Sequence, residues 1–142
     1  MKISKMTISP CVMRKEDPSW RFALAASPTT EGWIVTLESD SGTFGYGYAS
    51  ATAHMGASME GLKGTLERLQ PILLDQDPLN MSAIRKAMDR SLLGNNQAKA
   101  AIDTALFDLV CQLSTKSMPP IPNVLIAYVH ASFMQKVFNI SQ

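Results

Sequence analysis

The strongest constraint on the fold is a strand-like segment, residues 43–48, in which glycine alternates with aromatic residues. Successive side chains of a strand point to opposite faces. One face therefore carries Phe44, Tyr46 and Tyr48, while the other carries the bare backbone of Gly45 and Gly47 next to Thr43. Because glycine has no side chain to hold a neighbour away, we expect another element to pack closely against this second face.

Two further strands are predicted upstream. Apolar residues at positions 6, 8 and 12 alternate with polar ones, and Pro10 restricts this strand to an edge or a bulge, since proline has no N–H to donate. Aromatic and β-branched residues dominate positions 33–37, which indicates a central strand. The turn sequence Ser-Asp-Ser-Gly at 39–42 then returns the chain as a hairpin. Residues 20–27 are less regular and fit either a strand or an extended flap.

The apolar spacing changes to a helical period after residue 57 and predicts helices near 58–74, 78–92 and 96–113. Pro71 should kink or divide the first of these helices. Asp77 and Pro78 resemble a capped start of the second. Gly94 should end that helix in a left-handed conformation, and Asn95 or Asn96 should cap the next.

These patterns together predict an α+β fold, in which a three-stranded antiparallel meander packs beside a three-helix bundle. The third helix buries a stripe rich in small residues, which allows a neighbour to approach closely: Ala98, Ala101, Ile102, Ala105, Leu106, Leu109, Val110 and Leu113. Residues 1–118 are expected to form one domain. Residues 119–142 follow the proline-rich sequence at 119–122 as a weakly patterned tail.

Composition excludes several classes of function. The 142 residues include 13 basic and 12 acidic side chains, a net charge of +1, which gives no broad field for nucleic acid or an anionic membrane. Cys11 and Cys111 lie far apart without any metal or redox spacing, so we expect both to be small core residues. Neither a secretory signal nor a membrane span is predicted, and a cytoplasmic location is expected.

Few titratable residues invite a chemical role. Asp103 and Asp108 would point about 140° apart on a helix and cannot share one ion. We therefore expect surface pairing, with Lys99 one turn before Asp103, or a backbone cap. His54, with Met55, follows the aromatic strand in a loop of small residues, where it either contacts a ligand or is an ordinary loop residue.

Two further site types are disfavoured. The glycines at 42, 45 and 47 do not follow a nucleotide-binding spacing, so turn and packing roles explain them. Cys111 is predicted near the buried stripe and has no histidine nearby in the sequence, so a nucleophilic thiol is not expected.

The order of these elements resembles the N-terminal capping domain of the enolase superfamily, above all its mandelate racemase and muconate lactonizing branch. The resemblance covers about residues 2–118. It is carried by the hairpin with Asp-Ser-Gly at 40–42 and Gly-Tyr-Gly-Tyr-Ala at 45–49, and by Ala-Ala-Ile-Asp-Thr-Ala-Leu-Phe-Asp-Leu at 100–109.

The resemblance implies that catalysis belongs to a separate (β/α)₈ barrel, where lysine or histidine bases remove a proton next to a carboxylate and Mg²⁺ stabilises the enolate. The cap contributes only two segments that cover the substrate, matched here by residues 14–22 and 50–56. The residues implied to contact substrate are Trp20, Phe22, His54 and Met55. No catalytic residue, metal ligand or cofactor is expected within this chain; Mg²⁺ is expected only in the full-length family enzyme.

Three departures from the family pattern shape the functional expectation. Tyr48 occupies a position where many members have Glu, Ser117–Pro122 replaces the usual small-residue turn into the barrel, and no Asp or Glu occurs after Asp108. The tail therefore offers no carboxylate for Mg²⁺. We expect a truncated cap that is inactive alone and meets a barrel in trans or a second copy. The alternative is a stand-alone interaction or dimerisation module that uses the barrel-facing apolar surface.

Overall fold

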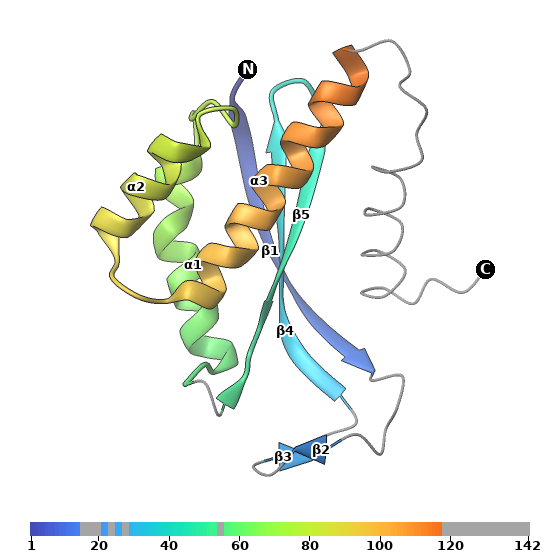
Figure 1. The fold of residues 1–142 in the computed structure, drawn as a ribbon, viewed down its shortest axis with the longest axis vertical. Coiled ribbons are helices and arrows are strands. Elements are labelled where there is room, and N and C mark those ends of the chain that lie inside the picture. Colours follow the sequence, from blue (N-terminus) through green and yellow to red (C-terminus); the bar gives the residue numbers. More distant parts are fainter. Residues whose placement is uncertain (15–20, 23–24, 27–28, 54–55, 118–142) are drawn as a thin grey trace, which may run out of the picture.

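The three long strands form one antiparallel sheet in the order β1-β4-β5 (Figure 1). They are β1 (Ile3–Arg14), β4 (Thr29–Ser39) and β5 (Phe44–Ser50). A computed structural model describes residues 1–14, 21–22, 25–26, 29–53 and 56–117 of the chain. Between β1 and β4, a separate two-stranded hairpin joins β2 (Arg21–Phe22) to β3 (Ala25–Ala26). The predicted meander is confirmed.

Three helices follow the sheet: α1 (Met59–Leu73), α2 (Met81–Ser91) and α3 (Asn96–Ser117). α1 packs against β1 and β4, and α3 packs against β4 and β5. The α+β class predicted from the change of period is therefore confirmed. Residues 119–142, expected to form a tail, lie outside the described residues.

The close packing expected at the glycines of β5 is present. A Cβ atom on Gly47 would overlap the carbonyl oxygen of Ala101, and one on Gly45 would overlap that of Ala105. Both carbonyls belong to α3, where the small buried residues let the helix backbone lie directly on the strand. The alternation of glycine in β5 and the small residues of α3 are two halves of one contact.

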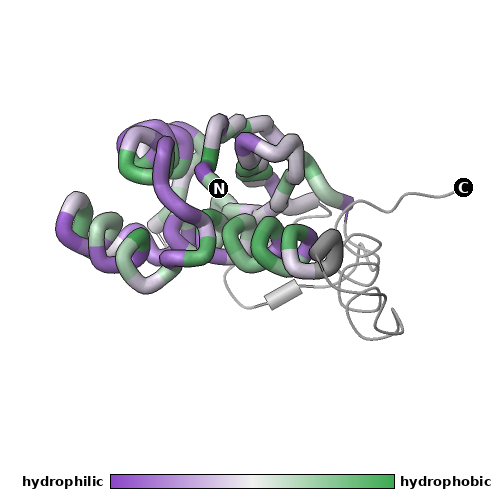
Figure 2. Tube along the Cα trace, turned by 90° about the horizontal axis from the view of Figure 1, so that it is seen from above, coloured by the Kyte–Doolittle hydropathy of each residue, from purple (hydrophilic) through white to green (hydrophobic). Residues whose placement is uncertain are grey.

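The core lies between the sheet and the helices. It combines the helix-facing residues of the sheet with the leucine stripe of α1 and the buried positions of α2 and α3: Ile3, Met6, Val35, Leu37, Leu62, Leu66, Leu69, Leu73, Ile84, Met88, Ile102, Leu106 and Leu109. Hydrophobic and hydrophilic residues alternate along the helical tubes in Figure 2, as expected for helices with one buried side. The predicted apolar stripes are confirmed, apart from Val110 of α3, which is only half-buried.

The predicted boundaries at both ends of the α1–α2 connection need correction. α1 continues through Pro71 instead of dividing there and ends at Leu73. Proline has no N–H to donate to the carbonyl one turn earlier, so the helix gives up one hydrogen bond close to its end. The Asp77–Pro78 pair forms a turn, not a helix start. The Asp77 carboxylate accepts from the N–H of Leu79, the Asp77 carbonyl accepts from the N–H of Asn80, and α2 begins only at Met81.

The α2–α3 connection follows the prediction in part. Gly94 has the expected left-handed conformation, with a φ of +68°, but it does not end α2, which stops at Ser91 and is followed by an extended Leu92. Asn95 also has a positive φ of +54°. The side chain of Asn95 does not make the predicted cap. Its amide group donates to the Leu93 carbonyl, and its oxygen accepts from the Thr65 hydroxyl. The loop is therefore tied to α1.

Among the described residues, no helix is both long enough and apolar enough to cross a membrane.

Candidate functional site

The two segments of interest leave the sheet at the same end. Arg14 at the end of β1 pairs with Thr29 at the start of β4, and Ser50 at the end of β5 pairs with Gly32 of β4. The β2–β3 hairpin and the loop after β5 therefore both extend from the lower end of the sheet in Figure 1. We refer to this region as the loop end of the sheet.

The four candidate contact residues belong to these segments. Phe22 lies in β2, where its backbone pairs with Ala25. Trp20, His54 and Met55 lie outside the described residues, so the structure does not show whether the four side chains meet. Their role remains a prediction.

The loop after β5 is held at both ends. The N–H of Ala51 donates to the Glu31 carbonyl at 2.8 Å, which extends the β4–β5 ladder by one residue. At the other end, the Ser58 hydroxyl accepts from the N–H of Gly61 at 3.0 Å and caps α1. The Trp33 indole N–H of β4 donates to the carbonyl of Met59 at 2.8 Å. These bonds fix where the loop starts and stops relative to the sheet.

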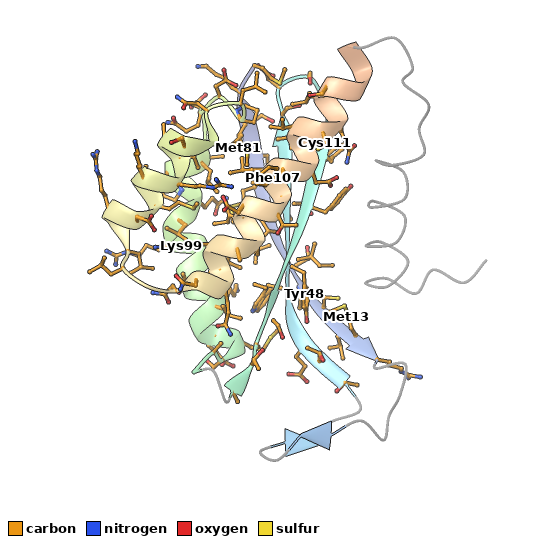
Figure 3. All side chains as sticks on the ribbon, in the orientation of Figure 1. Met13, Tyr48, Met81, Lys99, Phe107 and Cys111 are labelled. Carbon is orange, nitrogen blue, oxygen red and sulfur yellow. The ribbon has the colours of Figure 1, made fainter. Side chains whose placement is uncertain are left out.

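Tyr48 lies near the loop end, on the face of the sheet away from the helices. It lies opposite Ile34, and its ring leans toward the neighbouring Gly32, where an added Cβ would lie 2.6 Å from the tyrosine hydroxyl oxygen. Figure 3 places Tyr48 and Met13 in the lower half of the sheet. A glycine beneath an aromatic ring is a known way to stabilise a bare strand position. Tyr48 therefore covers backbone at Gly32.

The hydroxyl group of Tyr48 is buried and has no hydrogen-bond partner within the described part of the chain. Burial, followed by the charges of Cys11 and Glu31, raises the pKa of Tyr48 to about 12, against a smaller lowering by the nearby Ser50 hydroxyl, which lies outside good hydrogen-bond geometry. The phenol consequently stays neutral at physiological pH and offers a proton for hydrogen bonding, not a base.

Charged residues of α2 and α3 pair differently from the expectation. Asp103 does not pair with Lys99: both of its oxygens accept from Nε of Arg85 on α2, at 2.8 and 2.9 Å. Lys99 instead reaches Asp89 of α2 at 2.7 Å. The two pairs join α2 to α3, because α2 lies alongside the flank of α3 that carries Lys99 and Asp103.

Asp108 has a role that sequence reasoning missed. Its Oδ2 accepts from the backbone N–H of Tyr46 at 2.9 Å and from the side-chain amide of Gln112 at 3.2 Å. Pairing or a backbone cap was predicted for Asp103 alone, so the contact of Asp108 with the backbone was not predicted. The sequence signal was available: β5 was expected at the end of the meander, where alternate N–H groups lack a strand partner.

Both cysteines were expected to be core residues, and this expectation is wrong. Cys111 is exposed on α3, and Cys11 is half-buried on the sheet face away from the helices, where burial raises the pKa of its thiol. Within the described residues no three His, Cys, Asp or Glu side chains gather to hold a metal ion. Asp103 and Asp108 are engaged by Arg85 and the Tyr46 N–H, so these residues do not fit a Mg²⁺ site.

Comparison with known proteins gives a consistent result. Residues 4–119 match the family profile "Mandelate racemase / muconate lactonizing enzyme, N-terminal domain". The chain is 37% identical over 102 residues to N-succinyl-L-Arg/Lys racemase of Bacillus cereus, covering 70% of this chain and 27% of the relative. It is 34% identical over 110 residues to L-Ala-D/L-Glu epimerase of Bacillus subtilis, covering 76% and 30%.

Solved structures show the same relationship. The dipeptide epimerase of Enterococcus faecalis V583, complexed with Mg and the dipeptide L-Leu-L-Tyr, superposes with a TM-score of 0.75 at 27% identity, covering 81% of this chain and 32% of that one. The chain thus spans about 30% of the length of these relatives. Through its sheet and three helices, it belongs to the mandelate racemase and muconate lactonizing enzyme family of the enolase superfamily, of which it is an N-terminal capping domain.

Proposed function

We propose that this chain caps the active site of a racemase, epimerase or cycloisomerase that acts on a carboxylate substrate. The observation that carries the proposal is the common origin of the β2–β3 hairpin and the loop after β5 at one end of the sheet. Two segments on a rigid platform can close together over one substrate and exclude water.

The relatives support the class of substrate. The named proteins are a racemase of N-succinyl-L-Arg/Lys, an epimerase of L-Ala-D/L-Glu and chloromuconate cycloisomerases. Each of these compounds carries a carboxylate. Racemisation or epimerisation begins with removal of the proton next to the carboxylate, and a bound Mg²⁺ would stabilise the negative charge that develops.

The chain itself supplies binding and shielding, not the base or the metal. Its neutral Tyr48 phenol is no base at physiological pH, and its α3 carboxylates hold Arg85 and the edge of β5. We therefore propose that the chain alone is catalytically inactive and requires a barrel domain, supplied in trans or by a longer protein. His54, Met55, Trp20 and Phe22 are the proposed substrate contacts.

A chimera tests the capping role. Residues 3–117 would replace the equivalent cap of the Bacillus cereus racemase, whose barrel remains intact, and turnover of N-succinyl-L-Arg would be measured with Mg²⁺. We expect turnover by the chimera and none by the isolated 142-residue chain. A folded chimera without turnover on N-succinyl amino acids, Ala-Glu dipeptides or muconate would refute the capping role, and turnover by the isolated chain would refute its inactivity.

A further inference from the structure

Trp33 of β4 joins the sheet to the first turn of α1. The residue is half-buried on the face of the sheet that the helices cover, where it packs against the core. Its indole N–H donates to the carbonyl of Met59, the first residue of α1, at 2.8 Å. Nζ of Lys63, one turn further along the helix, lies 5.7 Å from the centre of the same ring. Trp33 therefore contacts α1 at two positions one turn apart.

The loop after β5, residues 51–58, ends where Trp33 contacts α1. Its first end continues the β4–β5 ladder at Ala51. Within the loop, the N–H of Ala57 donates to the carbonyl of Thr52 at 3.3 Å, which draws the two ends together. The first end is thus fixed by strand pairing, whereas the position of the second end depends on where the first turn of α1 lies.

We propose that Trp33 is a positioning residue for the loop after β5, which it holds through the first turn of α1. The Ser58 cap satisfies an N–H within this turn but does not tie the turn to the sheet, whereas the Trp33 bond does. Without that bond the turn can shift and carry the attached end of the loop with it. A displaced covering segment binds substrate less well, because such contacts depend on placement. This role rests on the proposed function, since it presupposes that the loop covers substrate.

Gln70 offers a matched contact near the other end of the same helix. Its side-chain amide donates to the carbonyl of Met6 in β1 at 3.1 Å. Both bonds run from a side-chain N–H to a backbone carbonyl, and both join α1 to the sheet. Loss of either bond should destabilise the fold, but only Trp33 contacts the turn that follows the loop. The pair therefore separates positioning from stability.

Turnover of N-succinyl-L-Arg by the cap chimera tests the role. Trp33→Phe keeps an aromatic ring and removes the N–H, and we expect KM to rise about five- to tenfold while kcat changes less than about twofold. Gln70→Leu should leave both constants within about twofold of the parent chimera. Thermal melts identify the temperature at which each variant is folded. An unchanged KM in folded Trp33→Phe, or an equal rise in Gln70→Leu, would overturn the proposal.

Hydrogen exchange measured by NMR on the full 142-residue chain gives a second readout that needs no barrel. In the wild-type chain the Trp33 indole N–H should exchange at least about tenfold more slowly than that of free tryptophan. Exchange at the free rate would overturn the proposal without any variant. In Trp33→Phe, the Leu62 N–H, which donates to the Ser58 carbonyl at 3.0 Å, should exchange about fivefold faster, while the Ala51 N–H should not change.

The two readouts separate the two proposals. An inactive parent chimera would refute the capping role, and hydrogen exchange would still decide whether Trp33 holds the loop. Equal acceleration at Leu62 and Ala51 in Trp33→Phe would show general loosening of the fold and would overturn the positioning role. Acceleration at Leu62 in Gln70→Leu as large as in Trp33→Phe would overturn it as well.

Discussion

The Asp108 carboxylate accepts a hydrogen bond from the backbone N–H of Tyr46, across 62 residues of sequence. This contact ties the third helix to the outer edge of the sheet. It satisfies an N–H group that an edge strand would otherwise leave without a partner in the protein. The same helix presses its small residues against the glycines of that strand, so side-chain and backbone contacts fix β5 together.

Removal of the Asp108 carboxylate should therefore destabilise the fold. Hydrogen bonds to charged groups contribute about 1.5–3 kcal/mol, and we expect Asp108→Ala to lower the free energy of unfolding by about that amount. Urea denaturation measures the change. Glu67→Ala is the control, since its exposed pair with Lys63 at 3.6 Å should contribute less than about 0.5 kcal/mol. Equal effects of the two substitutions would contradict the role given to Asp108.

The glycine contact predicts opposite effects of the same substitution at two sites. Gly47→Ala should destabilise by about 3 kcal/mol or more, because its Cβ would overlap the Ala101 backbone, which cannot move without shifting α3. Gly64→Ala is the matched control. Gly64 lies inside α1 with open space around it, so alanine should stabilise by roughly 0.5–1 kcal/mol. Thermal melts distinguish the two signs, and a neutral Gly47→Ala would refute the close packing.

Local pattern was sufficient to predict the layers of this fold, and it failed where a partner lay far away in sequence. The glycines of β5 and the small residues of α3 each predicted close packing, because each pattern can be recognised within its own segment. The pairing of Asp103 with Arg85 was missed since helix spacing favours the nearer Lys99, while tertiary packing brings α2 alongside. The helix start predicted at Asp77–Pro78 was wrong for another reason: the same two residues are common both in turns and at helix starts.

The loop end of the sheet was predicted only in outline. Antiparallel order places both covering segments together, and this follows from the meander alone. The buried hydroxyl of Tyr48 did not follow from it, because the ring leans toward Gly32 on the neighbouring strand, a contact that depends on strand register. Register was not available from one sequence.

The α2–α3 ion pairs make a distinct prediction about coupling. A double-mutant cycle on Arg85 and Asp103 should give a coupling energy of about 0.5–1 kcal/mol, modest because both side chains are partly exposed. The corresponding cycle on Lys99 and Asp103, which are one turn apart, should give a coupling near zero. Urea denaturation of the single and double variants measures both, and a larger coupling for Lys99 would reverse the assignment.

The final prediction concerns the buried hydroxyl of Tyr48. An unpaired polar atom costs free energy when buried, so Tyr48→Phe should stabilise the protein by about 1 kcal/mol at neutral pH. Destabilisation would contradict the unpaired state of the hydroxyl and point to a bond with Ser50, whose hydroxyl lowers the pKa of Tyr48. Serine at position 50 offers a control: Ser50→Ala removes a nearby hydroxyl that accepts from Thr52, and it should not stabilise.

The raised pKa gives the same variant a signature in alkali. An unfolded tyrosine ionises near pH 10, whereas burial keeps folded Tyr48 protonated up to about pH 12. Between these values the unfolded state releases a proton that the folded state retains, so wild-type stability should fall as pH rises from 10 to 12. Tyr48→Phe lacks this group, and the difference in unfolding free energy between variant and wild type should widen over that interval. A constant difference from pH 8 to 12 would show that Tyr48 ionises alike in both states.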